Sequence, residues 1–244
     1  MLVNTENTTI LLPVANVPMF ANQAIYHLIN NSPCKVIVLY DKGTPDQFVQ
    51  NDKVTYVKND HATGLCSLWN KCIEVCPTEY IILMAWRCRP TQNDFDIIFS
   101  KLNEGFGCVA TQTLHFFGFS KHLLTKIGFF DTGFTTGQWE DGDFYNRLCF
   151  ENIALYISNE TPEVVYNSTW LLNPEPNIKY YKSKWLESSP NLTMLKLEEN
   201  YDDRLKYKGL YEEKNYKTFD QSVLMDECVK KYFKENFTNY TRAY

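Results

Sequence analysis

The chain has 244 residues, of which 44% are hydrophobic and 22% are charged, so it can bury the core of a large domain and is not disordered in composition. Its formal net charge is −5, which excludes a general nucleic-acid binder, because such proteins rely on a strongly basic surface. Arginine is scarce, and two of the few arginines, Arg87 and Arg89, are separated by a single residue.

The N-terminus and the cysteines bear on the compartment in which the protein works. No basic region leads into an apolar run at the N-terminus, so we expect no secretory signal peptide. Residues 7–34 carry no charged side chain, but asparagines and prolines interrupt them, so we expect no membrane span. The cysteines form no CxxC pair, which favours reduced, buried thiols over a zinc site and predicts a cytoplasmic protein.

The first part of the chain alternates short apolar runs with segments of helical spacing. These patterns predict buried strands at residues 9–14, 35–40, 54–57 and 80–84, and helices at residues 21–29 and 65–75. Continuous apolar strands that alternate with helices indicate a mostly parallel sheet covered on both faces. Ligands of such sheets bind beyond the carboxyl ends of the strands. In this chain those ends are residues 15–16, 40–41 and 85–87.

Helical patterns continue downstream. Residues 95–102 are predicted to form a helix with Asp94 as its cap, and another helix is predicted to begin at Glu140 and Asp141. Its buried face would carry Phe144, Tyr145, Leu148 and Cys149. The Asn/Pro-rich segment 173–177 predicts a hinge that separates residues 1–172 from a charge-rich extension, residues 173–244, with a helix at 220–233.

Two nucleotide-binding fingerprints are missing from the sequence. No G-x-G-x-x-G motif follows the first predicted strand, and no G-x-x-x-x-G-K-[ST] motif occurs, which argues against a dinucleotide-dependent oxidoreductase and a P-loop enzyme. A sugar-nucleotide pyrophosphorylase would need a basic, glycine-rich loop after the first strand. Residues 14–18 are neither basic nor glycine-rich, so this class ranks low.

A series of motifs across residues 8–186 resembles the GT-A glycosyltransferases, the family-2-like group in particular. The motifs are Asp41 to Asp46 after the second strand, Gly64-Leu65, Thr78 to Met84, Gly128 to Asp131, and Gly137 to Leu148. The block from Trp139 to Leu148 also resembles a β-1,4-galactosyltransferase motif, and Tyr180 to Trp185 resembles an aromatic-basic signature of family-2-like enzymes. The order and spacing of these motifs carry the resemblance.

The resemblance implies an α/β fold with a GT-A-type, Rossmann-like, mostly parallel sheet flanked by helices. Residues 1–172 would be the catalytic domain that binds nucleotide sugar and acceptor, and residues 173–244 a helical extension packed on it. The implied activity is transfer of a sugar to a glycan or other hydroxyl acceptor, with inversion. A UDP-sugar is favoured over a GDP-sugar as the donor.

The resemblance also implies roles for individual residues. Asp141 would be the catalytic base, supported by Glu140. Acceptor binding falls to Trp139, Glu140 and Asp143. Donor binding falls to Pro13, Ala15, Asn16, Asp41, Ala85, Trp86, Arg87 and Arg89. Structural explanations stay open beside these roles, since Asp41 could simply form a turn, and carboxylates at a helix start are stabilised by the helix dipole.

The chain departs from the family where metal-binding aspartates are usual. After the fourth predicted strand it reads Ala85-Trp86-Arg87 in place of Asp-x-Asp, and no histidine follows Asp141. The Asp94/Asp96 and Asp141/Asp143 pairs lie elsewhere and are discounted as metal sites. Hard divalent cations need oxygen ligands, so we expect no divalent metal.

Arginine is the expected substitute for the metal. Arg87, helped by Arg89, Lys182 or Lys184, would bind the donor diphosphate, because a guanidinium can pair with phosphate oxygens in bidentate fashion. The alternative is a catalytically inactive nucleotide-sugar or glycan-binding module of the same fold.

Overall fold

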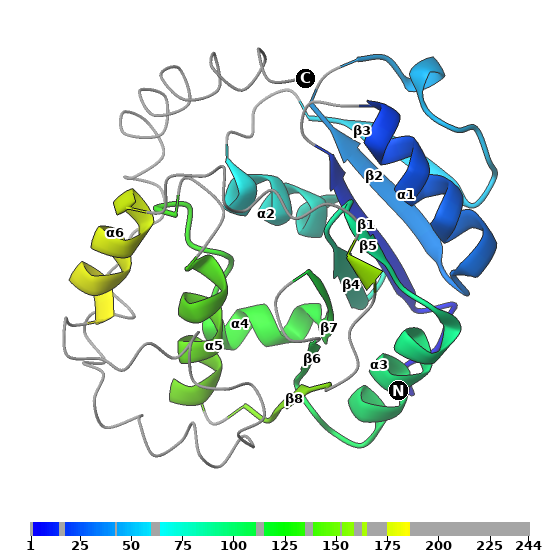
Figure 1. Ribbon diagram of the computed structural model, residues 1–244. Coiled ribbons are helices and arrows are strands. Elements are labelled where there is room, and N and C mark those ends of the chain that lie inside the picture. Colours follow the sequence, from blue (N-terminus) through cyan, green and yellow to red (C-terminus); the bar gives the residue numbers. More distant parts are fainter. Residues whose placement is uncertain are drawn as a thin grey trace.

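The computed structural model describes the residues that build the sheet and its covering helices (Figure 1). Described are residues 2–14, 18–41, 43–59, 64–110, 115–134, 139–151, 153–158, 163–164 and 175–185. The strands are β1 (Thr8–Val14), β2 (Lys35–Tyr40), β3 (Val54–Lys58), β4 (Tyr80–Met84), β5 (Cys88–Arg89), β6 (Cys108–Ala110), β7 (Phe116–Ser120), β8 (Leu155–Ile157) and β9 (Glu163–Val164). The α-helices are α1 (Pro18–Asn31), α2 (Leu65–Val75), α3 (Gln92–Asn103), α4 (Leu124–Ile127), α5 (Glu140–Phe150) and α6 (Glu175–Trp185), with 3-10 turns η1 (Pro45–Gln47) and η2 (Lys121–Leu123).

Seven strands form one mixed sheet in the order β3-β2-β1-β4-β7-β6-β8. The pairs β1–β2, β2–β3, β1–β4 and β6–β8 are parallel, whereas β7 runs antiparallel to both of its neighbours, β4 and β6. Strand β5 pairs with β9 in a separate two-stranded sheet. The expected α/β class with a mostly parallel, Rossmann-like sheet is confirmed, and so are the four strands predicted in the first part of the chain.

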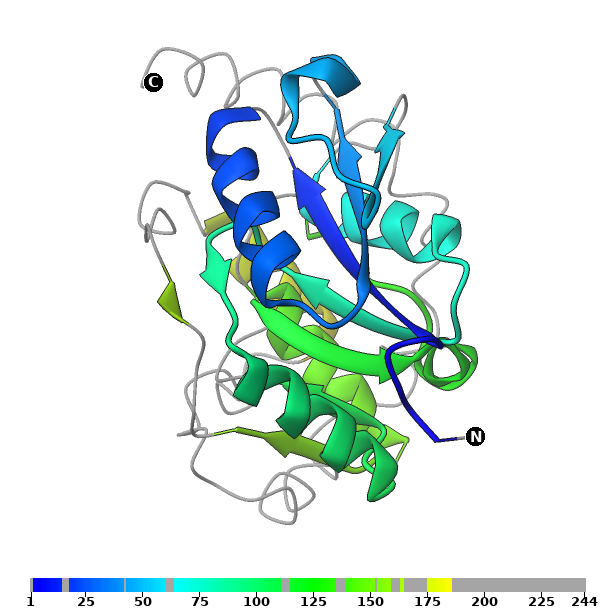
Figure 2. The same ribbon diagram turned by 90° about the vertical axis from the view of Figure 1, so that its right-hand side faces the viewer.

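Helices cover both faces of the sheet, as the uninterrupted apolar strands predict. Figure 2 shows α1 and α3 together on one face, with α2 on the other. Along β1 the side chains alternate between two cores, because successive residues of a strand point to opposite faces. Ile10 and Leu12 pack into the core under α1 and α3, while Leu11 packs into the core with α2, α4 and α5.

An aromatic layer joins helix α5 to the sheet. The rings of Phe130 and Phe144 stack with centroids 4.6 Å apart, and Phe117 of β7 meets Phe144 edge-on at 6.1 Å. Trp69 of α2, 4% exposed, packs edge-on against Phe130 at 4.7 Å. Aromatic pairs of this kind add stability beyond their buried area, so they hold the start of α5 in a defined position.

A buried arginine fixes α5 against α4. Arg147 is 2% exposed and forms an ion pair with Asp143 one turn earlier, with 2.9 Å between Nη2 and Oδ2. Its Nη1 also donates to the carbonyl oxygens of Ile127 at 2.6 Å and Phe129 at 2.8 Å. Ile127 is the last residue of α4, where a carbonyl oxygen has no partner within the helix and a cation is favoured by the helix dipole, and Phe129 lies two residues beyond.

Helix α6 packs on the rest of the described structure through two tyrosines. The Tyr180 hydroxyl donates to the carboxylate of Asp131, with distances of 3.1 and 3.0 Å to its two oxygens, and Asn146 Nδ2 donates to the Tyr181 hydroxyl at 2.8 Å. A helical segment therefore follows the predicted hinge. The domain boundary at residue 173 stays a prediction, and the helix predicted at 220–233 lies outside the described residues.

Two predicted helix starts are three residues late, since α1 begins at Pro18 and not at Ala21, and α3 shows an error of the same size. Helix α3 begins at Gln92, with Thr91 as its N-cap, and not at Phe95. Asp94 is the third helical residue of a capping box, in which its Oδ2 accepts from the Thr91 N–H at 2.7 Å. Asp94 therefore reaches back to the cap residue rather than capping the helix itself.

In the described ranges, no helix has both the length and the apolar character that crossing a bilayer requires.

Candidate functional site

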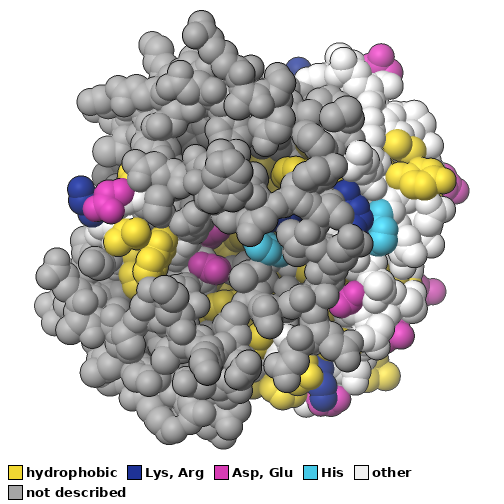
Figure 3. Space-filling view, in the orientation of Figure 1, with side chains coloured by type: hydrophobic (Ala, Val, Ile, Leu, Met, Phe, Trp, Pro, Cys, Tyr) yellow, Lys and Arg dark blue, Asp and Glu magenta, His cyan; other side chains and the backbone are white. Residues whose placement is uncertain are grey.

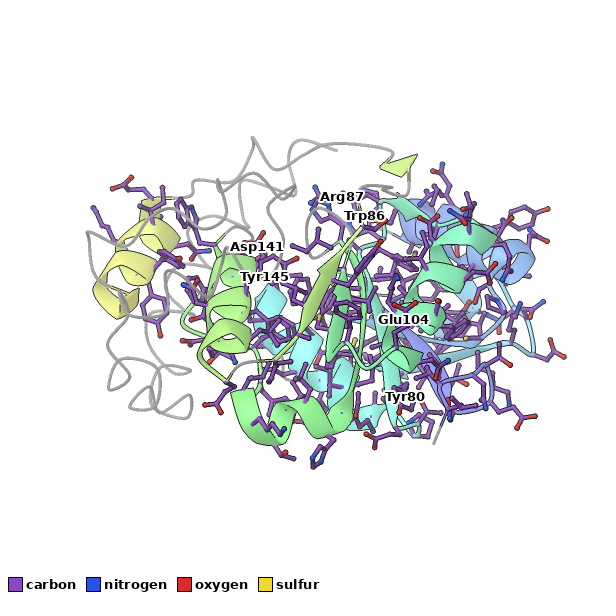
Figure 4. The ribbon with its side chains drawn as sticks, turned by 90° about the horizontal axis from the view of Figure 1, so that it is seen from below. Tyr80, Trp86, Arg87, Glu104, Asp141 and Tyr145 are labelled. Atoms are coloured by element: carbon purple, nitrogen blue, oxygen red, sulfur yellow. The ribbon has the colours of Figure 1, made fainter. Side chains whose placement is uncertain are left out.

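The site predicted from the sequence lies at the carboxyl edge of the sheet, defined here as the ends of β1, β2 and β4. These three strands are adjacent and parallel, so their carboxyl ends meet on one side of the molecule. Figure 4 shows Trp86 and Arg87 on this side, with Asp141 across from them, while Tyr80 at the start of β4 lies toward the opposite end. The fold thus places on this side of the molecule a cation, Arg87, and a carboxylate, Asp141, that are more than fifty residues apart in sequence.

Two of the predicted donor-binding residues, Pro13 and Asp41, lie at the carboxyl ends of β1 and β2. Pro13 is buried in β1 and pairs with Leu39 in the sheet register, and Asp41 directly follows the last residue of β2 with a half-buried side chain. Their donor-binding roles stay predictions. Ala15 and Asn16, expected beside them, lie outside the described residues.

The turn after β4 carries the arginine that replaces the expected metal-binding aspartate. Ala85, Trp86 and Arg87 are all half-buried, and the Ala85 N–H donates to the carbonyl oxygen of His115 at 2.7 Å. The Arg87 guanidinium contacts the imidazole of His115 through Nη2 and Nε2. Burial and the neighbouring Arg87 charge lower the pKa of His115 to about 3, so this imidazole is neutral at physiological pH.

Arg89 has a different environment from Arg87. It is 9% exposed, and its Nη1 donates to the carbonyl oxygens of Trp86 and Cys88, each at 2.8 Å. These bonds fold its side chain back onto its own turn. Arg89 therefore stabilises the β4–β5 turn, and Arg87 is the arginine of this turn placed to bind a ligand at the carboxyl edge. The sequence had suggested that both arginines bind the donor diphosphate.

The three carboxylates at the start of α5 differ in exposure. Glu140 is 7% exposed and Asp143 is 0% exposed, whereas Asp141 keeps a half-buried side chain. Oδ1 of Asp141 accepts from the N–H of Gly142 at 2.8 Å, and Asp143 is held by Arg147. Of the three, Asp141 therefore has the carboxylate most accessible to a bound molecule. The full burial of Asp143 does not fit the acceptor contact expected for it.

Trp139 precedes α5 in an unusual backbone conformation. Its φ of 73° lies in the left-handed region, which costs a bulky L-residue about 1–2 kcal/mol. Its carbonyl oxygen accepts from the Asp143 N–H at 3.1 Å, and its ring packs on Tyr181 with centroids 5.0 Å apart. The half-buried Trp139 ring is thus held against α6, two residues before Asp141 in the chain, and its acceptor-binding role stays a prediction.

Several residues important to the site were not assigned a role from the sequence. Asp131, Asn146 and Tyr180–Tyr181 stand within motifs of the sequence, and in the structure they form the hydrogen bonds that hold α6 beside α5. Their place within motifs that also contain proposed site residues was the feature of the sequence that could have indicated this role. For His115 the sequence carried no such signal, because its contact with Arg87 depends on the pairing of β4 with β7. The side chains of Lys182 and Lys184 lie outside the described residues.

Acidic, histidine and basic side chains come to the surface near one another around the middle of the face shown in Figure 3. In the described part of the chain, no group of three or more His, Cys, Asp or Glu side chains is arranged to hold a metal ion. At the turn after β4, Ala85, Trp86 and Arg87 have no side-chain oxygen, and the guanidinium repels cations. The residues of this turn therefore do not fit a divalent metal.

Comparison with known proteins places the fold among glycosyltransferases. No protein-family model and no curated protein sequence matches the chain. A mannosyltransferase from Pyrobaculum calidifontis, solved in complex with GDP-Man and Mn²⁺, is similar with a TM-score of 0.52 and 13% identity over 67% of this chain. GalNAc-T7, solved with UDP, GalNAc and Mn²⁺, is similar with a TM-score of 0.61 and 8% identity over 98% of this chain.

The chain spans 58% of the length of each of these two neighbours, and at such identities the likeness concerns the fold. In this chain the sheet is mostly parallel, with an antiparallel β7 inserted between β4 and β6. The chain has the GT-A-type fold of these glycosyltransferases.

Proposed function

We propose that this protein is a glycosyltransferase that moves a sugar from a nucleotide-sugar donor to a hydroxyl group of a glycan or small acceptor. One observation carries the proposal: a half-buried arginine, Arg87, and a half-buried carboxylate, Asp141, face the same carboxyl edge of a GT-A-type sheet (Figure 4). The cation suits the departing diphosphate, and the carboxylate suits the attacking hydroxyl group. Both neighbours of the same fold were solved with a nucleotide or nucleotide sugar.

The proposed reaction is a single displacement with inversion. The acceptor oxygen attacks the anomeric carbon while Asp141 takes the hydroxyl proton, and a new bond between carbon and oxygen forms. The bond from the anomeric carbon to the diphosphate oxygen breaks, and the nucleoside diphosphate leaves with the electron pair. Arg87 stabilises the negative charge that develops on this leaving group.

The remaining site residues take roles that follow from their positions. Trp139 offers an aromatic face to the acceptor next to Asp141, and Glu140 lies at the same helix start with its side chain turned inward. Asp143 holds Arg147 and through it the orientation of α5, so we assign it a positioning role instead of an acceptor contact.

On the donor side, Asp41 is proposed to accept a hydrogen bond from the nucleotide base. Pro13, Ala85 and Trp86 would line the path of the donor toward Arg87, and Ala15 and Asn16 belong to the same proposed group. A UDP-sugar is the proposed donor. GDP-sugars are the competing class, because one of the structural neighbours was solved with GDP-Man.

We also propose that transfer does not depend on a divalent metal, although both neighbours were solved with Mn²⁺. The supporting observation is the turn Ala85-Trp86-Arg87, where side-chain oxygens are missing and a guanidinium is present. Arg87 would supply the charge that a metal ion gives to a diphosphate in other enzymes.

The experiment is a transfer and donor-hydrolysis assay of the purified chain with a panel of UDP- and GDP-sugars, in excess EDTA and in Mn²⁺. Sugar release or transfer in EDTA supports the proposal, and NMR of the product anomer decides between inversion and retention. Activity that appears only with Mn²⁺ would overturn metal independence alone. Nucleotide binding without turnover of any donor would favour the inactive binding module, and absence of both binding and turnover would overturn the proposed function.

A further inference from the structure

The contact between Arg87 and His115 follows from the way β7 enters the sheet. Strands β4 and β7 are antiparallel, and Met84 at the end of β4 pairs with Phe116 at the start of β7. Ala85, which follows Met84, therefore lies opposite His115, which precedes Phe116. This register brings the side chain of His115 to the turn that carries Arg87, at the carboxyl edge of the sheet.

The backbone of His115 anchors the same turn independently of its side chain. The His115 carbonyl oxygen accepts from the Ala85 N–H at 2.7 Å and from the Cys88 thiol at 3.2 Å. A substitution at position 115 leaves this carbonyl group in place. The contribution of the imidazole can therefore be tested without removing the bonds that hold the turn.

The chemistry of the pair defines the role of the imidazole. A guanidinium has only donors, so Nε2 of His115 must accept from Nη2 of Arg87, and the ring proton must lie on Nδ1. Burial and the Arg87 charge lower the pKa of His115 to about 3, which keeps the ring in this neutral form. A carboxylate in the same place would cancel the Arg87 charge and compete with an anionic ligand. A neutral imidazole orients the guanidinium and leaves its full positive charge available.

We propose that His115 is a positioning residue that orients the Arg87 guanidinium for binding the diphosphate of the nucleotide donor. This inference rests on the proposed function and adds to it a residue to which the resemblance assigned no role. The affinity for the diphosphate would increase because His115 already binds one N–H group of the guanidinium and holds the Arg87 side chain in place before the ligand arrives. Less conformational freedom is then lost on binding.

The experiment compares nucleoside diphosphates with the matching nucleosides, because only the former carry the groups that Arg87 would contact. Binding of UDP, GDP, uridine and guanosine is measured by isothermal titration calorimetry in excess EDTA. The variants are Arg87→Gln, His115→Phe, His115→Asn and His115→Gln. The control is His122→Gln, since His122 is exposed and follows β7 at its opposite end. Circular dichroism and thermal unfolding establish that each variant is folded.

The expected results separate the effect of the imidazole on diphosphate binding from any effect of the substitutions on folding. We expect His115→Phe to weaken binding of the diphosphate roughly tenfold, the size of one hydrogen bond to a charged group, and to leave nucleoside binding unchanged. His115→Asn, whose amide is too short to reach, should behave in the same way if the bulkier Phe does not fold. His115→Gln should restore binding to within about threefold, because its amide oxygen can replace Nε2 as acceptor. His122→Gln should match the wild type.

The other outcomes distinguish failure of this inference from failure of the proposed function. If Arg87→Gln loses diphosphate affinity but His115→Phe and His115→Asn do not, the inference is overturned while the role of Arg87 stands. An equal loss for nucleosides and diphosphates would also overturn it, because that result reports a distorted site. If Arg87→Gln binds UDP and GDP like the wild type, the proposed role of Arg87 is wrong, and with it the inference. If the wild type binds neither diphosphate, the nucleotide-sugar function itself is wrong.

Discussion

Asp143 and Arg147 form a buried ion pair one turn apart on α5, with exposed side-chain fractions of 0% and 3% and a distance of 2.9 Å between Nη2 and Oδ2. The same arginine binds the carbonyl oxygens at the end of α4. Two residues before Asp143, Asp141 stays half-buried at the helix start. The pair thus sets the orientation of the helix that presents the proposed base.

Removing the charge of Asp143 should destabilise the protein strongly. In Asp143→Asn, Arg147 would be left buried without its counter-ion, and breaking such a pair costs about 3–5 kcal/mol. We expect a loss of this size in the free energy of unfolding measured by urea denaturation. Asp52→Asn, an exposed acidic residue, is the matched control and should change stability by less than about 0.5 kcal/mol. Equal effects of the two variants would contradict the structural role of Asp143.

Replacing the proposed base should impair transfer without unfolding the protein. Asp141→Asn keeps the shape of the side chain and the acceptance from Gly142, but its amide cannot take a proton. We expect kcat to fall by about 10²–10⁴, with UDP affinity and melting temperature unchanged. Steady-state kinetics of donor and acceptor together with UDP titration make the measurement. Transfer at the wild-type rate would show that another group is the base.

Acid should destabilise the fold partly through His115. Its pKa is lowered to about 3 in the folded state from a usual value of 6.5, so below pH 6.5 the unfolded chain binds a proton that the folded chain does not. The contribution of this group to the free energy of unfolding is therefore complete above pH 6.5. It decreases as the pH is lowered below that value, by no more than about 1.4 kcal/mol per pH unit. Between pH 7.5 and 5.0, urea unfolding should show about 2 kcal/mol less loss for His115→Gln than for the wild type. Parallel pH profiles of the two proteins would refute this assignment.

The loop before α5 has no room for a side chain at Gly133. A Cβ atom built there would lie 2.2 Å from the Tyr180 ring of α6, so Gly133→Ala must displace that ring. We expect a loss of about 1–3 kcal/mol in the free energy of unfolding, the usual range for overpacking. Tyr180→Ala removes the ring and also the hydrogen bonds to Asp131. In a double-mutant cycle, the alanine at 133 should cost much less in the Tyr180→Ala background, whereas additive effects would contradict the contact.

The sequence predicted the parallel part of the sheet well because that information is local. Strands β1, β2, β3 and β4 are apolar runs separated by turn residues, and their observed bounds lie within one residue of the prediction. The start of α5 at Glu140 was predicted from the buried spacing of Phe144, Tyr145 and Leu148, all at most 2% exposed. The error at α3 has a local cause too, since Asp94 fits a cap and a third helical position equally well.

The sequence by itself determined that this chain forms an α/β sheet with Arg87 just beyond the carboxyl end of its fourth strand, because strand and helix periodicity depends on near neighbours along the chain. Only the tertiary structure decided which arginine and which carboxylate remain accessible. Arg87 and Arg89 differ because one meets His115 across the β4–β7 pairing and the other binds its own turn. Asp141 and Asp143 differ because Arg147 and the aromatic layer bury one side of α5. Such differences depend on strand register and packing between distant segments, which residue spacing does not encode.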